Sequence, residues 1–241
     1  VEASEAYARA KRVWAGVFGA SFALFVASTV AISNNEAQGF WVDYARIALL
    51  VAPWLVVALM KQYRGVVLLS GARGGAPKSG QILLLLAIGA GMHGMISFHT
   101  LDHGSLLSAG AVLGLALFFA LTRAIGNLGK NEGSFLFLLA AAFLFYGYGV
   151  AVAVNCRLDR GRVLSYSTNV TGKRERRGKS TSYFLRVGPW GPLPEGNEFQ
   201  VGYLTYVRAR EGDKLEMLLH RGALGARWFT FRGGASGASA R

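Results

Sequence analysis

Four long stretches without any charged residue constrain this chain more than any other feature of its sequence. Each stretch contains between 17 and 22 residues and no Asp, Glu, Lys or Arg: 13–33, 82–100, 106–122 and 135–156. The hydrocarbon core of a bilayer requires about 20 apolar residues in a helix, and a helix satisfies its own backbone hydrogen bonds there. The sequence therefore predicts an integral membrane protein.

A fifth span is predicted at 40–60, although this stretch includes Asp43 and Arg46. Trp41 and Tyr44 at its start are typical of aromatic side chains in the headgroup layer. Pro53 is tolerated inside a span, because neighbouring helices satisfy the carbonyl that proline leaves without its helical partner. The predicted fold of residues 1–156 is a bundle of five transmembrane helices, with spans at about 13–33, 40–60, 82–100, 104–122 and 135–156.

The Lys and Arg residues of the short connections predict the orientation of this bundle. Cytoplasmic loops of membrane proteins carry an excess of these residues. One side of the predicted bundle holds nine of them, whereas the short loops of the other side hold only Arg46. The nine are Arg9, Lys11, Arg12, Lys61, Arg64, Arg73, Lys78, Arg123 and Lys130. The amino terminus is therefore expected in the cytoplasm and, after an odd number of spans, residues 157–241 are expected on the opposite side.

Charge and composition suggest where such a membrane would be. Residues 156–241 contain sixteen Lys or Arg and seven Asp or Glu, so they contribute +9 of the net charge of +13. Arg outnumbers Lys by nineteen to seven, and this bias is compatible with a GC-rich bacterial genome. We expect the inner membrane of a bacterium, with the carboxyl-terminal domain in the periplasm or outside the cell.

After Cys156 the sequence changes from long apolar runs to short alternating ones, which indicate half-exposed strands. Five strands are predicted, at 163–171, 181–187, 199–207, 215–220 and 227–232. Five short strands in about 75 residues are typical of a small all-β barrel of the OB or SH3-like kind. Residues 157–232 are therefore predicted to form a β-rich soluble domain, and 233–241 a flexible tail.

Three segments of the soluble domain resemble the small extracytoplasmic β modules of bacterial membrane proteins called DUF3592-like. The segments are 166–172, 182–185 and 211–225, and their main shared feature is a Gly-Asp turn before an alternating strand. The chain lacks the Tyr-Asp-Pro ending expected of these modules. The resemblance implies a membrane-tethered β module, and it implies no particular chemistry.

Histidines near the end of the third span are the sharpest candidates for chemistry. On a helix, His99 and His103 would share one face and could bind one transition-metal ion, with Asp102 or water completing its shell. Cys156, the single cysteine of the chain, is expected at the same membrane depth. The alternative is that the histidines bind lipid phosphate or helix ends and that Cys156 is a small apolar residue at a helix terminus. In that case no cofactor is expected.

His93 lies near the middle of the third predicted span, where a polar side chain usually faces other helices. We interpret it as a hydrogen-bonding contact between helices, with a proton or ligand path as the alternative. Four histidines are too few for the membrane di-iron oxygenases that use histidine boxes. The sequence also contains no nucleotide-binding loop, nucleophile elbow or paired-carboxylate arrangement. It therefore favours a role that is not enzymatic.

Gly110 and Gly114, four residues apart in the fourth span, predict close helix packing. Packing within the chain is the simpler interpretation, and packing against a partner's helix is the alternative.

The densest basic run of the chain is expected at the tip of a hairpin in the β domain. Its residues are Lys173, Arg174, Arg176, Arg177 and Lys179. Such a basic patch could contact anionic lipid headgroups, and the alternative is a solvated turn. No nucleic-acid partner is expected, because no base-reading motif accompanies the patch and an outer location would separate it from nucleic acid.

These observations predict an accessory or structural subunit of a membrane complex. Its helices would pack with a partner membrane protein or a second copy of the chain, and its basic β domain would make extracytoplasmic contacts. One alternative is a metalloprotein with a histidine-based site at the outer end of the third span. Another is a membrane-tethered sensor of an anionic ligand, whose β domain would lie in the cytosol if the second span did not cross.

Overall fold

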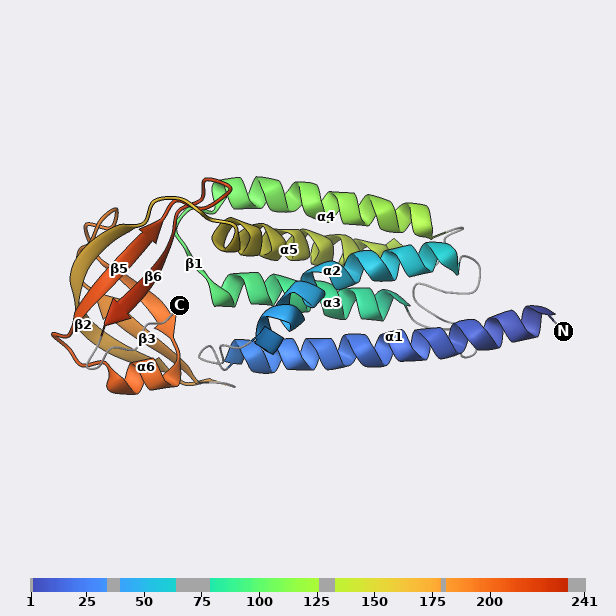
Figure 1. Ribbon diagram of the computed structural model, residues 1–241, viewed down its shortest axis with the longest axis horizontal. Helices are drawn as coiled ribbons and strands as arrows, with labels where there is room; N and C mark the ends of the chain where they lie inside the picture. The colour runs from blue at the N-terminus through green and yellow to red at the C-terminus, as the bar shows by residue number, and fades with distance from the viewer. Residues whose placement is uncertain (1, 34–39, 64–78, 126–132, 179–180, 234–241) are drawn as a thin grey trace. The chain divides into compact units, whose positions relative to one another are not determined.

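The computed structural model describes residues 2–33, 40–63, 79–125, 133–178 and 181–233, which divide into two compact units (Figure 1). The helical unit contains most of the five long helices: α1 (Glu2–Ser33), α2 (Phe40–Gln62), α3 (Ser79–Ser97), α4 (Gly104–Ala124) and α5 (Gly133–Arg157). The barrel unit contains a short helix, α6 (Tyr203–Arg208), and six strands: β1 (His99–Thr100), β2 (Leu164–Arg176), β3 (Ser182–Val187), β4 (Asn197–Val201), β5 (Lys214–His220) and β6 (Trp228–Gly233).

Four helices of the described chain are long and apolar enough to cross a membrane. They are Ala8–Ala27 within α1, Ser79–Ser97, Gly104–Ala124 and Gly133–Arg157. Four of the five stretches predicted as spans thus form helices that are long and apolar enough to cross a membrane. The stretch predicted as a fifth span does form a helix, α2, but α2 is not among the four. Arg46 and Lys61 leave only 14 uncharged residues between them, fewer than a span normally requires.

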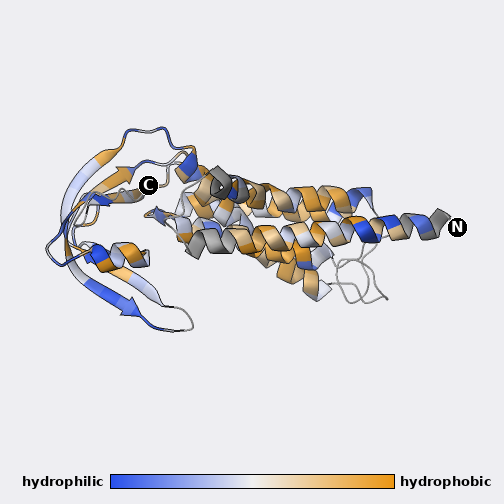
Figure 2. Cartoon of the chain, turned by 60° about the horizontal axis from the view of Figure 1, so that its bottom comes forward, coloured by the Kyte–Doolittle hydropathy of each residue, from blue (hydrophilic) through white to orange (hydrophobic). Residues whose placement is uncertain are grey.

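Hydrophobic residues predominate along the long helices of the helical unit (Figure 2). α3 is the most buried of the four apolar helices. In its most apolar 18-residue segment, 61% of the residues are buried, compared with 17% in that of α1. Large side chains fill the space between the helices, among them Leu86, Leu117, Leu139, Phe143 and Tyr146. Other large apolar side chains point outward, such as Phe137, which is 80% exposed. The helical unit is therefore apolar both in its interior and on its surface, as expected for helices surrounded by lipid.

Glycines allow α5 to pack against both α3 and α4 at the distance of backbone contact. A Cβ atom at Gly149 would lie 2.6 Å from the carbonyl oxygen of Ala90, and one at Gly110 would lie 2.6 Å from Cα of Tyr148. Gly114 faces the backbone of α5 in the same way. The two glycines predicted to pack helices therefore lie against a helix of the same chain.

The strands form one antiparallel sheet in the order β1-β6-β5-β2-β3-β4. Its two edge strands, β1 and β4, approach each other. The ring of His99 in β1 lies 5.4 Å from the ring of Phe199 in β4. The sheet is thus a nearly closed six-stranded barrel. Its interior is apolar and includes Val170, Leu185, Trp190, Phe199, Met217 and Phe229.

The strands predicted at 181–187, 215–220 and 227–232 agree with β3, β5 and β6 within one residue at each end. β2 continues five residues beyond its predicted end at 171. The register shifts between Val170 and Gly172, and such a bulge bends a strand without ending it. β2 therefore pairs with β5 in its first half and with β3 in its second half.

One further prediction about the β domain is wrong. The predicted strand 199–207 is divided into β4 and α6, and α6 places the ring of Tyr206 4.8 Å from that of Tyr183. The barrel unit also includes residues 97–105 and 153–157, which precede the predicted start of the β domain at residue 157. The α3–α4 connection supplies β1, a strand that alternation over two residues cannot predict. Residues 234–241, predicted as a tail, lie outside the described residues.

Candidate functional site

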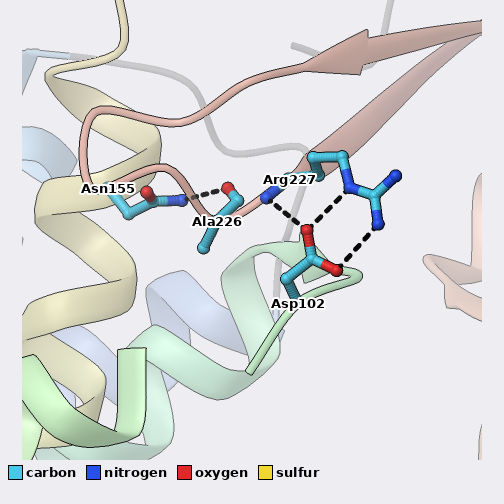
Figure 3. A network of polar contacts seen from close by, with 4 residues as sticks. All are labelled: Asp102, Asn155, Ala226 and Arg227. Carbon is cyan, nitrogen blue, oxygen red and sulfur yellow. Dashed lines mark hydrogen bonds and ion pairs between the residues drawn. The ribbon is translucent and has the colours of Figure 1, made fainter. Parts of the chain in front are cut away.

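The loop between β5 and β6, residues 221–227, makes several hydrogen bonds to segments far away in the sequence, and we call it the junction loop. Asn155, in the last turn of α5, is fully buried and makes three hydrogen bonds to it. Its Nδ2 donates to the carbonyl oxygen of Ala226 over 2.8 Å (Figure 3). Its Oδ1 accepts from the backbone N–H of Leu224 over 2.9 Å, and its carbonyl oxygen accepts from that of Ala223, also over 2.9 Å.

Gly222 makes the close approach of Asn155 possible. Its φ of +79° is a conformation that side chains disfavour, and a Cβ atom there would lie 2.5 Å from Nδ2 of Asn155. The carboxylate of Asp159 accepts hydrogen bonds from the N–H of Gly222 over 2.8 Å and from the indole of Trp228 over 3.0 Å. Burial alone would raise the pKa of Asp159, but these bonds and one from the N–H of Gly161 lower it overall.

Asp102, in the α3–α4 connection, binds the far end of the junction loop. Its carboxylate accepts from Nε of Arg227 over 2.7 Å, from Nη2 over 3.0 Å and from the backbone N–H over 3.1 Å (Figure 3). The N–H of Leu101 donates to the carbonyl oxygen of Arg227 over 2.8 Å. The hydrogen bond from Arg227 lowers the pKa of Asp102. Both side chains are more than a third exposed, so the ion pair itself contributes about 1 kcal/mol or less.

His99 belongs to the apolar interior of the barrel. Its ring stacks on Phe229 with centroids 5.1 Å apart and meets the edge of Phe199. Burial lowers the pKa of His99 to about 4, because a charged imidazolium would lose its hydration there. The ring is therefore neutral at pH 7 and acts as a packing residue.

We expect the barrel unit to lose stability as the pH falls from 6.5 towards 4. The unfolded chain binds a proton at His99 near pH 6.5, whereas the folded chain resists protonation until about pH 4. This difference stabilises the fold fully above pH 6.5 and amounts to up to about 3 kcal/mol. Burial also lowers the pKa of His220, which adds to the same slope.

The measurement is the thermal unfolding midpoint between pH 7.5 and pH 4.5, for the parent chain and for His99→Phe. The variant should keep only the part of the slope that comes from His220, because phenylalanine preserves the ring contacts without a titrating group. An unchanged slope in His99→Phe would contradict this assignment.

The predicted metal ligands do not form one group. α3 ends at Ser97, so His99 and His103 do not share a helix face, and that part of the prediction is wrong. The exposed His103 lies with Nδ1 3.4 Å from the hydroxyl of Thr100, and Cys156 is buried in the last turn of α5. Among the residues that the structure describes, no group of three or more His, Cys, Asp or Glu is arranged to hold a metal ion.

His93 is fully buried within the helical unit, where α3 packs against its neighbours. This location fits a residue that faces other helices rather than lipid.

The predicted basic patch lies along the end of β2 and continues into the connection that joins it to β3 in an antiparallel hairpin. Its described members are Lys173, Arg174, Arg176 and Arg177, and Lys179 lies outside the described residues. Nζ of Lys173 donates to the carbonyl oxygen of Ala209 over 2.7 Å. Arg174 forms an ion pair with Glu198. Part of the patch is therefore bound to neighbouring elements of the barrel.

Sequence reasoning missed Asn155, Asp159 and Arg227 as members of a site. One signal was present, since Asn155 is the only amide side chain in the four uncharged stretches. Burying an amide without hydrogen-bond partners costs free energy. The place of Asn155 at the end of a span therefore already indicates that another segment of the chain forms hydrogen bonds with it. The identity of that segment depends on the fold.

Comparison of the chain with models of known protein families, with curated proteins and with solved structures finds no match. The resemblance to DUF3592-like modules therefore stays a prediction, and the function must be inferred from the geometry.

Proposed function

We propose that this chain is a non-enzymatic accessory subunit of a membrane complex, and that its barrel makes contacts outside the cytoplasm. One observation carries the proposal: the barrel unit includes the α3–α4 connection and the last turn of α5 as structural parts. β1 pairs with β6 at His99↔Phe229 and Thr100↔Trp228, and Asn155 is bonded to the junction loop.

The barrel unit is connected to the helices at more than one point of the chain. Here the chain enters the barrel unit at residue 97, returns to the helical unit after 105, and enters again at 153. Segments from three parts of the sequence, 97–105, 153–157 and 221–227, therefore meet within the barrel unit. Such a barrel suits a subunit that makes contacts outside the helices.

The packing of α2 supports its assignment as a fifth span. The hydroxyl of Tyr146, midway along α5, donates to the carbonyl oxygen of Leu50 over 2.5 Å. A Cβ atom at Gly89, midway along α3, would lie 3.4 Å from the side chain of Leu49. The middle of α2 is thus level with the middles of α3 and α5. Its 23 residues extend about 34 Å, enough to cross the same thickness.

Five crossings place the two ends of the chain on opposite sides. The basic residues near the start of α1 and after α2 favour the cytoplasm for the amino end. The barrel would then face the periplasm or the exterior.

A reporter enzyme that is active only outside the cytoplasm tests this proposal when it is fused after Arg241 of the full chain. We expect activity in that fusion and none when the same reporter follows Gln62, at the end of α2. A reporter that is inactive after Arg241 would place the barrel in the cytoplasm. That result would refute the extracytoplasmic role and would favour the sensor of an anionic ligand.

A further inference from the structure

The short helix α6 presents three large apolar side chains to the surface of the barrel unit. Tyr203 is 59% exposed, Leu204 is 46% exposed and Val207 is 55% exposed. Positions i, i+1 and i+4 lie on one side of a helix, so the three side chains form a single apolar face. We call these three residues the α6 face. Clustered apolar residues on a soluble surface mark a contact with a membrane or another protein.

The other side of α6 fixes this helix to the barrel. The ring of Tyr206 packs against Tyr183 and lies 4.4 Å from Nζ of Lys173. Ala209, directly after the helix, is buried and accepts the hydrogen bond from Lys173. These contacts fix α6 to the barrel, and the side chains of the α6 face point to the surface.

The surroundings of the α6 face are basic. The two segments that form this part of the barrel, 172–187 and 197–214, contain nine Lys or Arg and four Asp or Glu. Arg208 ends α6 and Arg210 follows it, and both are exposed. An apolar face with a positive rim matches an anionic bilayer surface, where acyl chains lie below a layer of phosphates.

The α6 face lies near the strand by which the chain enters the barrel from α3. α6 begins four residues after Phe199, a distance of at most roughly 14 Å. The ring of Phe199 contacts that of His99, which is two residues beyond the end of α3. α6 and β1 are thus neighbours within the barrel unit.

We propose that α6 binds the surface of the bilayer that holds the chain's own helices, with the α6 face inserted among the headgroups and upper acyl chains of anionic lipids. Arg208 and Arg210 would bind the lipid phosphates, and the Tyr203 ring suits the interface because it is apolar with one polar end. This deepens the proposed function and rests on it only for membrane attachment. The sequence predicted the basic run on β2 as the segment that contacts lipid, whereas the proposed segment is α6, which the sequence did not indicate.

The test uses the full chain in nanodiscs, with Cys156→Ala to remove the native thiol. A single cysteine is introduced by Leu204→Cys and labelled with a fluorophore, and lipids with spin labels near the headgroup quench any fluorophore that they contact. The matched control is Ser167→Cys, at an exposed position on β2. We expect strong quenching at 204 in discs that contain phosphatidylglycerol, weaker quenching in phosphatidylcholine alone, and little quenching at 167.

A double variant separates the charge contribution from the apolar one. Arg208→Ala with Arg210→Ala should lower the ratio of inserted to free α6 by about tenfold in phosphatidylglycerol, with an unchanged thermal midpoint. Equal quenching at 204 and 167, or equal quenching in the two lipid compositions, would overturn the proposal. Either result leaves the location of Arg241 unaffected, so failure here and failure of the proposed function can be told apart.

Discussion

Replacing Gly147 by leucine will force α4 and α5 apart and destabilise the helical unit by about 3 kcal/mol or more. A Cβ atom at Gly147 would lie against the carbonyl oxygen of Gly110 and 2.7 Å from the backbone nitrogen of Gly114. Neither neighbour is a flexible side chain that could move away. Packing is the main force between helices in lipid, so the loss cannot be recovered by hydrophobic burial elsewhere. Thermal unfolding in detergent, followed by tryptophan fluorescence, measures the effect.

Gly16→Leu is the matched control for this prediction. Gly16 is also a glycine within a long helix, but a Cβ atom there would have no atom within 4 Å. Leucine also has a higher helix propensity than glycine, so this variant should be as stable as the parent. Similar midpoints for Gly147→Leu and Gly16→Leu would contradict the backbone packing of α4 against α5.

Replacing Asn155 by leucine should destabilise the barrel unit by about 2–5 kcal/mol. The substitution leaves the carbonyl of Ala226 and the N–H of Leu224 without their partner in a site where Asn155 itself is fully buried. Each unsatisfied buried group costs about 1–3 kcal/mol. The Cγ of leucine is also tetrahedral where the amide carbon is planar, so its methyl groups would crowd Gly222. The free energy of unfolding in denaturant, with and without the substitution, gives the magnitude.

Arg227→Ala provides the comparison for Asn155→Leu, because both changes remove contacts with the junction loop. The Asp102–Arg227 pair is partly exposed, so its loss should cost about 1 kcal/mol or less. If the two variants lost equal stability, Asn155 would not be the residue that contributes most to holding the junction loop in place.

The helices and most strands could be predicted because their signals are local. An uncharged run such as 135–156 has only one stable form in lipid, and alternation at 215–220 defines a strand with one buried face. The α2 helix shows where local signals are insufficient. Arg46 and Lys61 shorten its apolar run, and only its contacts with Gly89 and Tyr146 show which parts of α3 and α5 it packs against.

The error at His99 has a physical cause. The uncharged stretch 82–100 continues past the end of the helix, and hydropathy does not distinguish a buried helix from a buried strand. His99 pairs with Phe229, a partner 130 residues away, and such pairing leaves no pattern within the α3–α4 connection itself. The metal hypothesis required a helix that continues to His103. The helix ends at Ser97, so His99 and His103 do not lie on one helix face.

The junction could be predicted only in part. Asn155 stands out as a polar residue in an apolar run, but nothing near it identifies the backbone groups that it binds. Its partners lie about 70 residues later, in a loop without a distinctive motif. Backbone acceptors and donors carry no sequence identity, so this kind of site becomes visible only when the fold brings the two segments together.

The central claim is that the α3–α4 connection forms part of the barrel, and a disulfide across β1 and β6 tests it most directly. Thr100 and Trp228 are paired in the ladder, at a Cα separation that a disulfide can bridge. In a Cys156→Ala chain with Thr100→Cys, Trp228→Cys and a protease site inserted at 126–132, oxidation followed by cleavage should leave the two fragments joined until a reductant is added. Fragments that separate without reductant, as in a control pairing Thr100→Cys with Glu216→Cys, would contradict the claim.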